Sequence, residues 1–239
     1  MHSFHYQGAL DINKARIEHL DSLNLNFTNK TVLETGCGGR GDFTRYLLSK
    51  NATVTLNDYR QENITALLRS LNENLDSNTW DLNKAFPSDK KFDIIVSYGT
   101  LYHLNKPEDA IINLSKSCNE FLVLSTCTNG KNDESINVTS ENVAVNNQAG
   151  DGFGCRPGRL FLFNTLRRNF QYVYLIKTQP NNDEFPLHFP TNTVSNARNV
   201  FIGSHIKLEN DLLVEELIND YTHTYDCVII LNIFIIPVL

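Results

Sequence analysis

The sequence lacks the features of several protein classes. It has no long run of lysine and arginine, and its formal net charge of −6 opposes binding to the phosphate backbone of a nucleic acid. Its five cysteines form no CxxC pair, so neither a disulfide framework nor a zinc knuckle is expected. No set of histidine and acidic residues has the spacing of metal ligands. These absences predict reduced thiols, no metal, no nucleic-acid partner and a cytoplasmic location.

Long apolar segments are also missing. The first residues contain no apolar stretch of the kind found in a secretory signal, so we expect none. The most apolar segment, Cys227 to Leu239, is shorter than the roughly 20 residues that a helix needs to span a bilayer. We expect this tail to form a buried strand or to dock on the domain, with insertion into a membrane as the alternative.

What the sequence does contain is an alternation of short apolar strands and amphipathic helices. Strands are predicted at residues 31–34, 52–58, 79–82, 91–97, 121–125, 172–176 and 200–204, and helices at 12–23, 42–48, 62–75, 107–114 and 157–170. The nearly continuous apolar run at 91–97 is typical of a strand buried in a parallel sheet. The alternation therefore predicts an α/β fold.

Three segments depart from this alternation. Residues 126–157 and 178–197 are polar or proline-rich and have no regular period, and loops of such length within a compact domain are usually functional or mobile. We expect both on the substrate side. Residues 1–29 form a predicted helical arm, preceded by aromatic and histidine residues, that either packs on the domain or folds as a flap over a ligand. All belong to one predicted domain, residues 1–239.

The most informative stretch, residues 31–47, carries a cluster of glycines between a strand and a helix: Gly36, Gly38, Gly39 and Gly41. Glycine is needed where the backbone takes a positive φ or lies directly against a ligand. The amides in the first turn of the following helix then point at whatever sits there. Three of these glycines satisfy G-x-G-x-x-G, which alone is a weak indicator of nucleotide binding.

Three acidic residues narrow the choice of ligand. Glu34 stands two residues before Gly36, where a carboxylate would repel a pyrophosphate but suit a cation. Asp58 ends the second strand, placed to accept hydrogen bonds from ribose hydroxyls, and Asp81 ends the third, placed to receive an adenine amino group. Each has a structural alternative: a helix-dipole partner for Glu34, an N-cap for Asp58 and a turn former for Asp81.

Together these residues resemble the class I S-adenosylmethionine-dependent methyltransferases over residues of about 30 to 125. VLETGCGGRGDF is similar to the first motif of that family, the strand ending at Asp58 to its second, TWDL to its adenine-side motif, and FDIIVSYGTLYHL to its fourth-strand motif. The resemblance implies S-adenosylmethionine as cofactor. It also implies a Rossmann-like, seven-stranded, mostly parallel sheet with helices on both faces and an antiparallel last strand.

The same resemblance implies which residues hold the cofactor. Glu34 and the glycine turn would hold the methionine moiety, Asp58 the ribose hydroxyls, and Tyr59 one face of the adenine. Residues after the third strand would meet the adenine edge, and those after the fourth would pass beneath the sulfonium. The implied set is Glu34, Gly36, Cys37, Gly38, Gly39, Asp58, Tyr59, Asp81, Leu82, Ser97, Tyr98 and Gly99.

Methyl transfer to an unactivated hydroxyl also requires alignment of the acceptor and removal of its proton. His103, which follows the fourth strand, is the first candidate base, with orientation of its loop or capping of the next helix as the alternative. His188 is the second candidate and His5 the third. Tyr102, Arg156 and His5 are predicted to contact the substrate. Arg156 would clamp a carboxylate or phosphate, or else pair with surface acids.

Two later segments suggest the acceptor. GFGCRP and VYLIKTQPNNDEFP are similar to segments on the substrate side of a group of bacterial-type small-molecule methyltransferases, which tend to accompany sugar and surface-glycan pathways. We therefore expect O-methylation of a sugar or nucleotide-sugar. The alternatives are a protein methyltransferase, a non-catalytic cofactor-binding partner subunit and an NAD-dependent dehydrogenase. The apolar tail departs from this group, which leaves contacts in a homodimer open.

Overall fold

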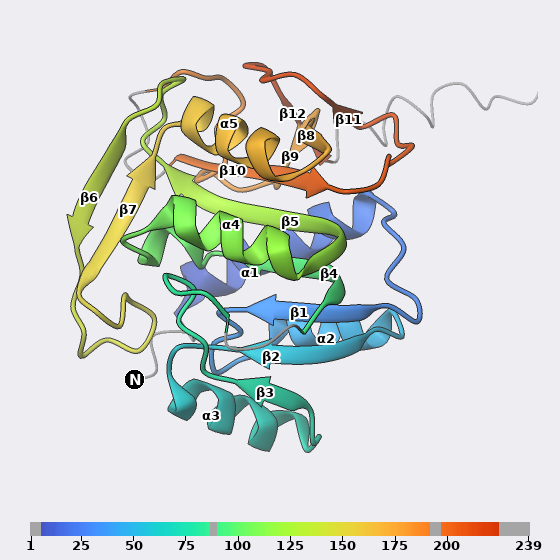
Figure 1. The fold of residues 1–239 in the computed structure, drawn as a ribbon, viewed down its shortest axis with the longest axis vertical. Helices are drawn as coiled ribbons and strands as arrows, with labels where there is room; N and C mark the ends of the chain where they lie inside the picture. Colours follow the sequence, from blue (N-terminus) through green and yellow to red (C-terminus); the bar gives the residue numbers. More distant parts are fainter. Residues whose placement is uncertain (1–5, 87–89, 192–196, 225–239) are drawn as a thin grey trace, which may run out of the picture.

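The computed structural model describes residues 6–86, 90–191 and 197–224 (Figure 1). Its centre is a twisted sheet of eight strands in the order β11-β8-β10-β5-β4-β1-β2-β3. Predictions for His5 and for the apolar tail fall outside the described residues.

The sheet strands are β1 (Thr31–Thr35), β2 (Thr53–Asn57), β3 (Asp76–Asn78), β4 (Phe92–Tyr98), β5 (Cys118–Thr128), β8 (Tyr172–Ile176), β10 (Ala197–Ser204) and β11 (Leu213–Val214). Strands β1 to β5 pair in parallel, whereas β10 runs antiparallel to both of its neighbours, β5 and β8. The predicted Rossmann-like, mostly parallel sheet with an antiparallel last long strand is confirmed. The two-residue strand β11 extends it at one edge.

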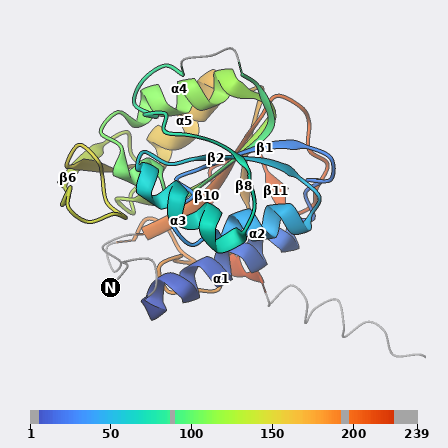
Figure 2. The ribbon, with the colours of Figure 1, turned by 90° about the horizontal axis from the view of Figure 1, so that it is seen from below.

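Helices cover both faces of the sheet (Figures 1 and 2). They are α1 (Gln7–Ser22), α2 (Asp42–Ser49), α3 (Gln61–Leu71), α4 (Pro107–Ser117) and α5 (Arg159–Asn169). Because side chains alternate across a strand, β4 contributes side chains to two hydrophobic clusters, one on each face of the sheet. Ile94 and Val96 pack in the cluster that includes residues of α1, α2 and α3, whereas Ile95 packs in the cluster of α4 and α5.

Several predicted boundaries were wrong, among them the start of α1, which lies at Gln7 and not at Ile12. Asn72 adopts a left-handed conformation (φ +55°) and ends α3 at Leu71, before the predicted end at residue 75. Strand β3 lies at Asp76–Asn78 and not at residues 79–82. It pairs only with β2 and is composed of polar residues, so no apolar pattern marked it.

The predicted loops contain short strands. Within residues 126–157, β6 (Ile136–Ser140) and β7 (Phe153–Pro157) form an antiparallel ribbon. At the start of residues 178–197, β9 (Thr178–Gln179) pairs with β12 (Thr222–His223). In the described part of the chain, no helix has the length and apolar character needed to cross a membrane.

Candidate active site

One cavity, of about 220 Å³, lies where β1, β2 and β4 end. Its walls come from the glycine turn, the residues that follow β2 and β4, one side of α1, and residues 146–151. The predicted site residues that line it are Glu34, Gly36, Cys37, Gly38, Asp58, Tyr59, Asp81, Leu82, Tyr98, Gly99, Tyr102 and His103. The fold thus brings most of the residues singled out from the sequence into one cavity.

The glycine turn requires glycine for two separate reasons. Gly36 and Gly38 both have positive φ, +61° and +62°. A Cβ on Gly36 would also lie 2.2 Å from Oγ1 of Thr100. That hydroxyl donates a hydrogen bond to the carbonyl oxygen of Thr35 at 2.9 Å. The turn after β1 is therefore held directly against the segment that follows β4.

Glu34 is a buried carboxyl group at the end of β1, with 4% of its surface exposed. The hydroxyl of Thr44 donates a hydrogen bond to its Oε2 at 2.6 Å. Burial raises the pKa of Glu34 to about 8, and the negative charges of Asp42 and Asp58 add to the effect, while the Thr44 bond opposes it. At neutral pH, without a cation beside it, Glu34 is therefore mainly protonated.

Asp58 joins the glycine turn to the start of α3. Its Oδ2 accepts a hydrogen bond from the amide of Gly38 at 2.9 Å. Its Oδ1 accepts one from the amide of Arg60 at 2.9 Å and one from the side chain of Asn63 at 3.0 Å. Burial raises the pKa of Asp58, and these three bonds oppose that rise. Asp58 therefore supports the turn before α3 and lines the cavity, but it is not the N-cap of that helix, which is Arg60.

Tyr59 and Asp81 lie further along the same wall. Tyr59 is 55% exposed, and a Cβ on Gly150 would lie 2.1 Å from its Cε1, so its ring lies against the Gly150 backbone. Asp81 accepts a hydrogen bond from the amide of Asn83 at 3.0 Å and pairs with Lys84 at 3.1 Å. Asp81 thus forms a turn and lines the cavity at once.

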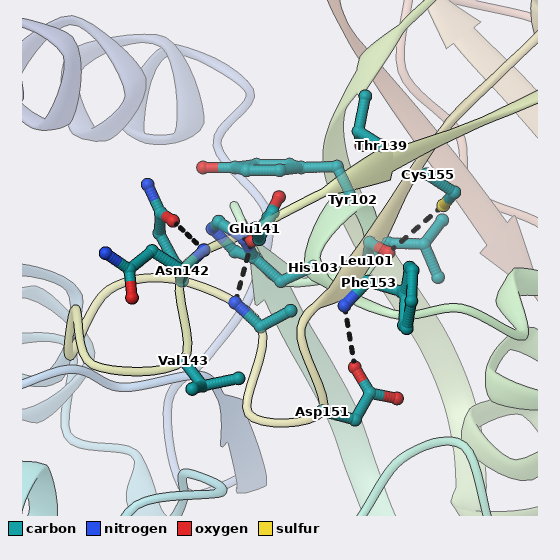
Figure 3. Close-up of polar contacts among 12 residues, drawn as sticks. Leu101, Tyr102, His103, Thr139, Glu141, Asn142, Val143, Asp151, Phe153 and Cys155 are labelled. Carbon is teal, nitrogen blue, oxygen red and sulfur yellow. Dashed lines mark hydrogen bonds and ion pairs between the residues drawn. The ribbon is translucent and has the colours of Figure 1, made fainter.

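His103 lines the cavity and has a carboxylate partner, Glu141. It lies in a short 3-10 helix, η2 (Leu101–His103), and its Nδ1 is 2.5 Å from Oε2 of Glu141. Figure 3 shows both side chains beside the ring of Tyr102, whose centroid is 4.1 Å from that of His103. A carboxylate on Nδ1 favours the tautomer that leaves Nε2 free to accept a proton.

Glu141 is held in place from several sides. Its Oε2 also accepts a hydrogen bond from the amide of Ala149 at 2.7 Å. Burial alone would raise the pKa of Glu141, but the hydrogen bond and charge of His103, the Ala149 amide and the charge of Arg156 outweigh burial and lower it. Glu141 is therefore ionised at neutral pH and can stabilise a proton on His103.

Residues 141–152 connect β6 and β7 and are tied to α3; we call them the 141–152 loop. A guanidinium nitrogen of Arg60 donates a hydrogen bond to the carbonyl oxygen of Val143 at 2.8 Å. The side chain of Asn63 donates one to the carbonyl oxygen of Asn146 at 3.1 Å. The loop thus closes the cavity over the residues that follow β2.

Sequence reasoning missed Glu141 and two buried arginines, Arg16 and Arg198, that line the cavity. Arg16 had a readable signal, because it lies four residues from Ile12 and four from Leu20, on the apolar stripe of α1. Glu141 lies in a polar loop with no pattern around it, so no local signal marked it.

Four predicted residues do not line the cavity. Arg156 donates hydrogen bonds to the carbonyl oxygens of Cys155 and Tyr102, at 2.8 and 3.2 Å. The side chain of His188 is 81% exposed and its Nδ1 is 2.8 Å from Asp220. Gly39 and Ser97 also lie outside the lining residues. The positions of Arg156 and His188 thus do not support the roles predicted for them.

Comparison with known sequences identifies one family. Residues 33–120 match the family model described as a methyltransferase domain. No curated protein matches the sequence significantly.

Solved structures share the fold at low identity. The N-terminal domain of EvdMO1, determined in the presence of S-adenosylhomocysteine (SAH) and D-fucose, is 16% identical, with a TM-score of 0.63 and 84% of each chain covered. A putative S-adenosylmethionine-dependent methyltransferase from Listeria monocytogenes is 12% identical, with a TM-score of 0.59, covering 81% of this chain and 99% of its own. Magnesium protoporphyrin IX methyltransferase from Synechocystis PCC 6803, with bound S-adenosylmethionine, is 14% identical, with a TM-score of 0.55 and 84% of each chain covered.

Proposed function

We propose that this chain, whose residues 33–120 match a methyltransferase-domain model, is a class I S-adenosylmethionine-dependent methyltransferase that methylates a hydroxyl group of a small sugar or nucleotide-sugar. The observation that carries the proposal is that His103, which lines the cavity together with Glu34, Gly36 and Asp58, has Glu141 as its carboxylate partner. A base oriented by a carboxylate suits an acceptor that must lose a proton.

The cavity residues fit the cofactor. Glu34 is a buried acid whose raised pKa disfavours ionisation until a cation lies beside it, and the methionine end of the cofactor is cationic. Gly36 and Gly38 leave the backbone open to a close ligand. The Asp58 carboxylate, fixed by the Gly38 amide, retains lone pairs that ribose hydroxyls can use. We propose that these residues hold the methionine and ribose parts.

The catalytic contribution of the protein is proton removal and alignment. When bound, the cofactor supplies an electrophilic methyl group on a sulfonium. We propose that Nε2 of His103 accepts the proton of the acceptor hydroxyl while Nδ1 stays bonded to Glu141. The carboxylate stabilises the imidazolium that forms. A positioned base of this kind contributes about 10²–10⁴-fold to the rate.

Two observations support a sugar acceptor. The N-terminal domain of EvdMO1, which shares the fold, was determined together with D-fucose. The segments GFGCRP and VYLIKTQPNNDEFP resemble the substrate side of methyltransferases that accompany sugar pathways. The first of these segments spans β7, which starts directly after the loop that carries Glu141.

The test measures transfer of a labelled methyl group to a panel of hexoses, deoxyhexoses and nucleotide-sugars. His103→Ala is expected to lower kcat about 10²–10⁴-fold while SAH affinity changes little. His188→Ala is the matched control, because that exposed histidine lies outside the cavity, and it should behave as the wild type. Transfer to proteins but to no sugar would overturn the proposal, as would SAH binding without transfer to any acceptor.

A further inference from the structure

Two arginines lie buried in the wall of the active-site cavity. Arg16 comes from α1 and Arg198 from the start of β10, and only 5% and 9% of their surfaces are exposed. Burial, together with the charge of Arg198, lowers the pKa of Arg16 to about 10, so Arg16 still carries its charge at neutral pH. Two like charges are thus kept together in a place that water reaches poorly.

Their hydrogen bonding is incomplete. Arg198 Nε donates to Oε2 of Glu184 at 2.6 Å, and Arg16 Nη1 donates to Oδ1 of Asn13 at 3.3 Å. Among the residues that the structure describes, Nε and Nη2 of Arg16 and Nη1 of Arg198 have no hydrogen-bond partner. Glu184 therefore pairs with Arg198, whereas no described carboxylate is bonded to Arg16. A buried cation without a partner is costly, and a bound anion would remove that cost.

Arg198 comes from a part of the sheet away from the glycine turn. Strand β10 is three positions away from β1, with β5 and β4 between them, which is roughly 14 Å at the usual strand spacing. The guanidinium of Arg198 lies 5.0 Å from the ring centroid of Tyr102, and that ring also contacts His103. A Cβ on Gly99, after β4, would lie 3.2 Å from Nη1 of Arg16. Arg198 thus packs on the ring that contacts the candidate base, and Arg16 lies beside the residue that follows β4.

We propose that Arg16 and Arg198 form a subsite for an anionic group, a carboxylate or a phosphate, on the methyl acceptor. Guanidinium forks bind both anions through paired charge-assisted hydrogen bonds. The inference rests on the proposed function and narrows it to acidic or phosphorylated sugars. It also replaces Arg156, whose nitrogens serve backbone carbonyl oxygens, as the anion-binding arginine.

The experiment measures binding to the SAH-saturated protein by calorimetry, with inorganic phosphate, D-glucuronate and D-glucose as probes. At least one anion is expected to bind about tenfold or more tightly than glucose, since each charge-assisted bond contributes at this level. Phosphate and glucuronate distinguish the two anion classes. Arg16→Met and Arg198→Met should each weaken binding of the preferred anion by about tenfold or more. Arg168→Met, at an exposed arginine paired with Glu108, is the matched control and should have no effect.

A melting temperature without ligand separates binding from a structural role. Arg16→Met removes a buried charge with incomplete pairing, so it should melt no lower than the wild type, whereas a structural arginine would cause a loss. Arg16→Lys keeps the charge but not the planar fork, so it should weaken the preferred anion even if the methionine variant does not fold.

Two results would overturn the inference. In the first, glucose binds as tightly as both anions. In the second, SAH affinity itself falls in the arginine variants, which would assign the pair to the carboxylate of the cofactor. Both of these results come from binding measurements and not from methyl transfer. Failure of the proposed function would instead appear as SAH binding without transfer to any sugar, so the two failures can be told apart.

Discussion

Replacing Glu34 by glutamine tests whether this buried acid recognises the cationic end of the cofactor. Glutamine keeps the shape and can still accept the hydrogen bond from Thr44, but it cannot ionise. In the folded protein without ligand the pKa of Glu34 is about 8, compared with about 4.3 for an ordinary glutamate. If the cofactor binds only to the ionised form, its binding must release the proton that Glu34 carries.

The size of the effect follows from that pKa. Well below pH 8, the ionised fraction of Glu34 rises about tenfold with each pH unit, so the Kd for S-adenosylmethionine should fall about tenfold from pH 6 to pH 7. The α-amino group of the cofactor stays charged over this range, because its pKa is about 7.8. Close to one proton should be released on binding at pH 7, whereas Glu34→Gln should show neither proton release nor pH dependence.

The stability of the ligand-free protein provides an independent test. Ionisation of Glu34 lowers that stability, whereas it favours cofactor binding. Because the folded-state pKa of Glu34 is raised, the wild type is favoured below about pH 4 and loses stability as the pH rises toward 8, by roughly 3–4 kcal/mol at pH 7. Glu34→Gln should therefore melt higher than the wild type at pH 7 and about equally near pH 4. Calorimetry in buffers of different ionisation enthalpy measures the protons. A Kd independent of pH in the wild type, or the same slope in the variant, would refute the reasoning.

Three further outcomes are expected. Glu141→Gln should lower kcat with little change in the KM for the acceptor, because the amide no longer stabilises protonated His103; an unchanged kcat would remove Glu141 from the mechanism. Gly36→Ala should abolish SAH binding by calorimetry, because its Cβ meets Thr100, whereas Gly39→Ala, at the turn glycine without a left-handed φ, should retain it. Burial raises the pKa of the Cys155 thiol to about 12, so a maleimide should leave Cys155 unmodified near pH 7 until the protein is unfolded; rapid labelling would contradict its burial.

The parts of the fold that could be predicted are those whose burial leaves a local pattern. Strands β4 and β5 are apolar because both of their faces are covered by helices, so each could be placed from its own residues. Strand β3 lies at the polar edge of the sheet, and β6 is largely exposed, so neither carries such a pattern. The end of α3 depends on the left-handed conformation of Asn72, which the apolar period running on to Leu75 concealed.

The candidate site likewise contains residues that a local pattern marked and residues that no local pattern marked. The glycine turn and the acids at the ends of β1 and β2 are local features, so the sequence alone singled out Glu34, Gly36 and Asp58, and all three line the cavity. By contrast, the groups proposed to contact the base and the acceptor come from segments that are distant in the sequence. Glu141 is 38 residues from His103, and the two buried arginines come from opposite ends of the chain. Only the assembled fold could bring these groups together.

The 141–152 loop contacts both the candidate base, His103, and helix α3 beside the proposed cofactor wall. Its first residue, Glu141, orients His103, while its later residues are bonded to α3 beside the cofactor wall. Any movement that opened the cofactor side would also withdraw the carboxylate from the base. Since such coupling is reciprocal, a cofactor that favours the closed loop also favours the oriented histidine, and by the same factor. On the proposed mechanism, cofactor binding and orientation of the base would therefore strengthen each other.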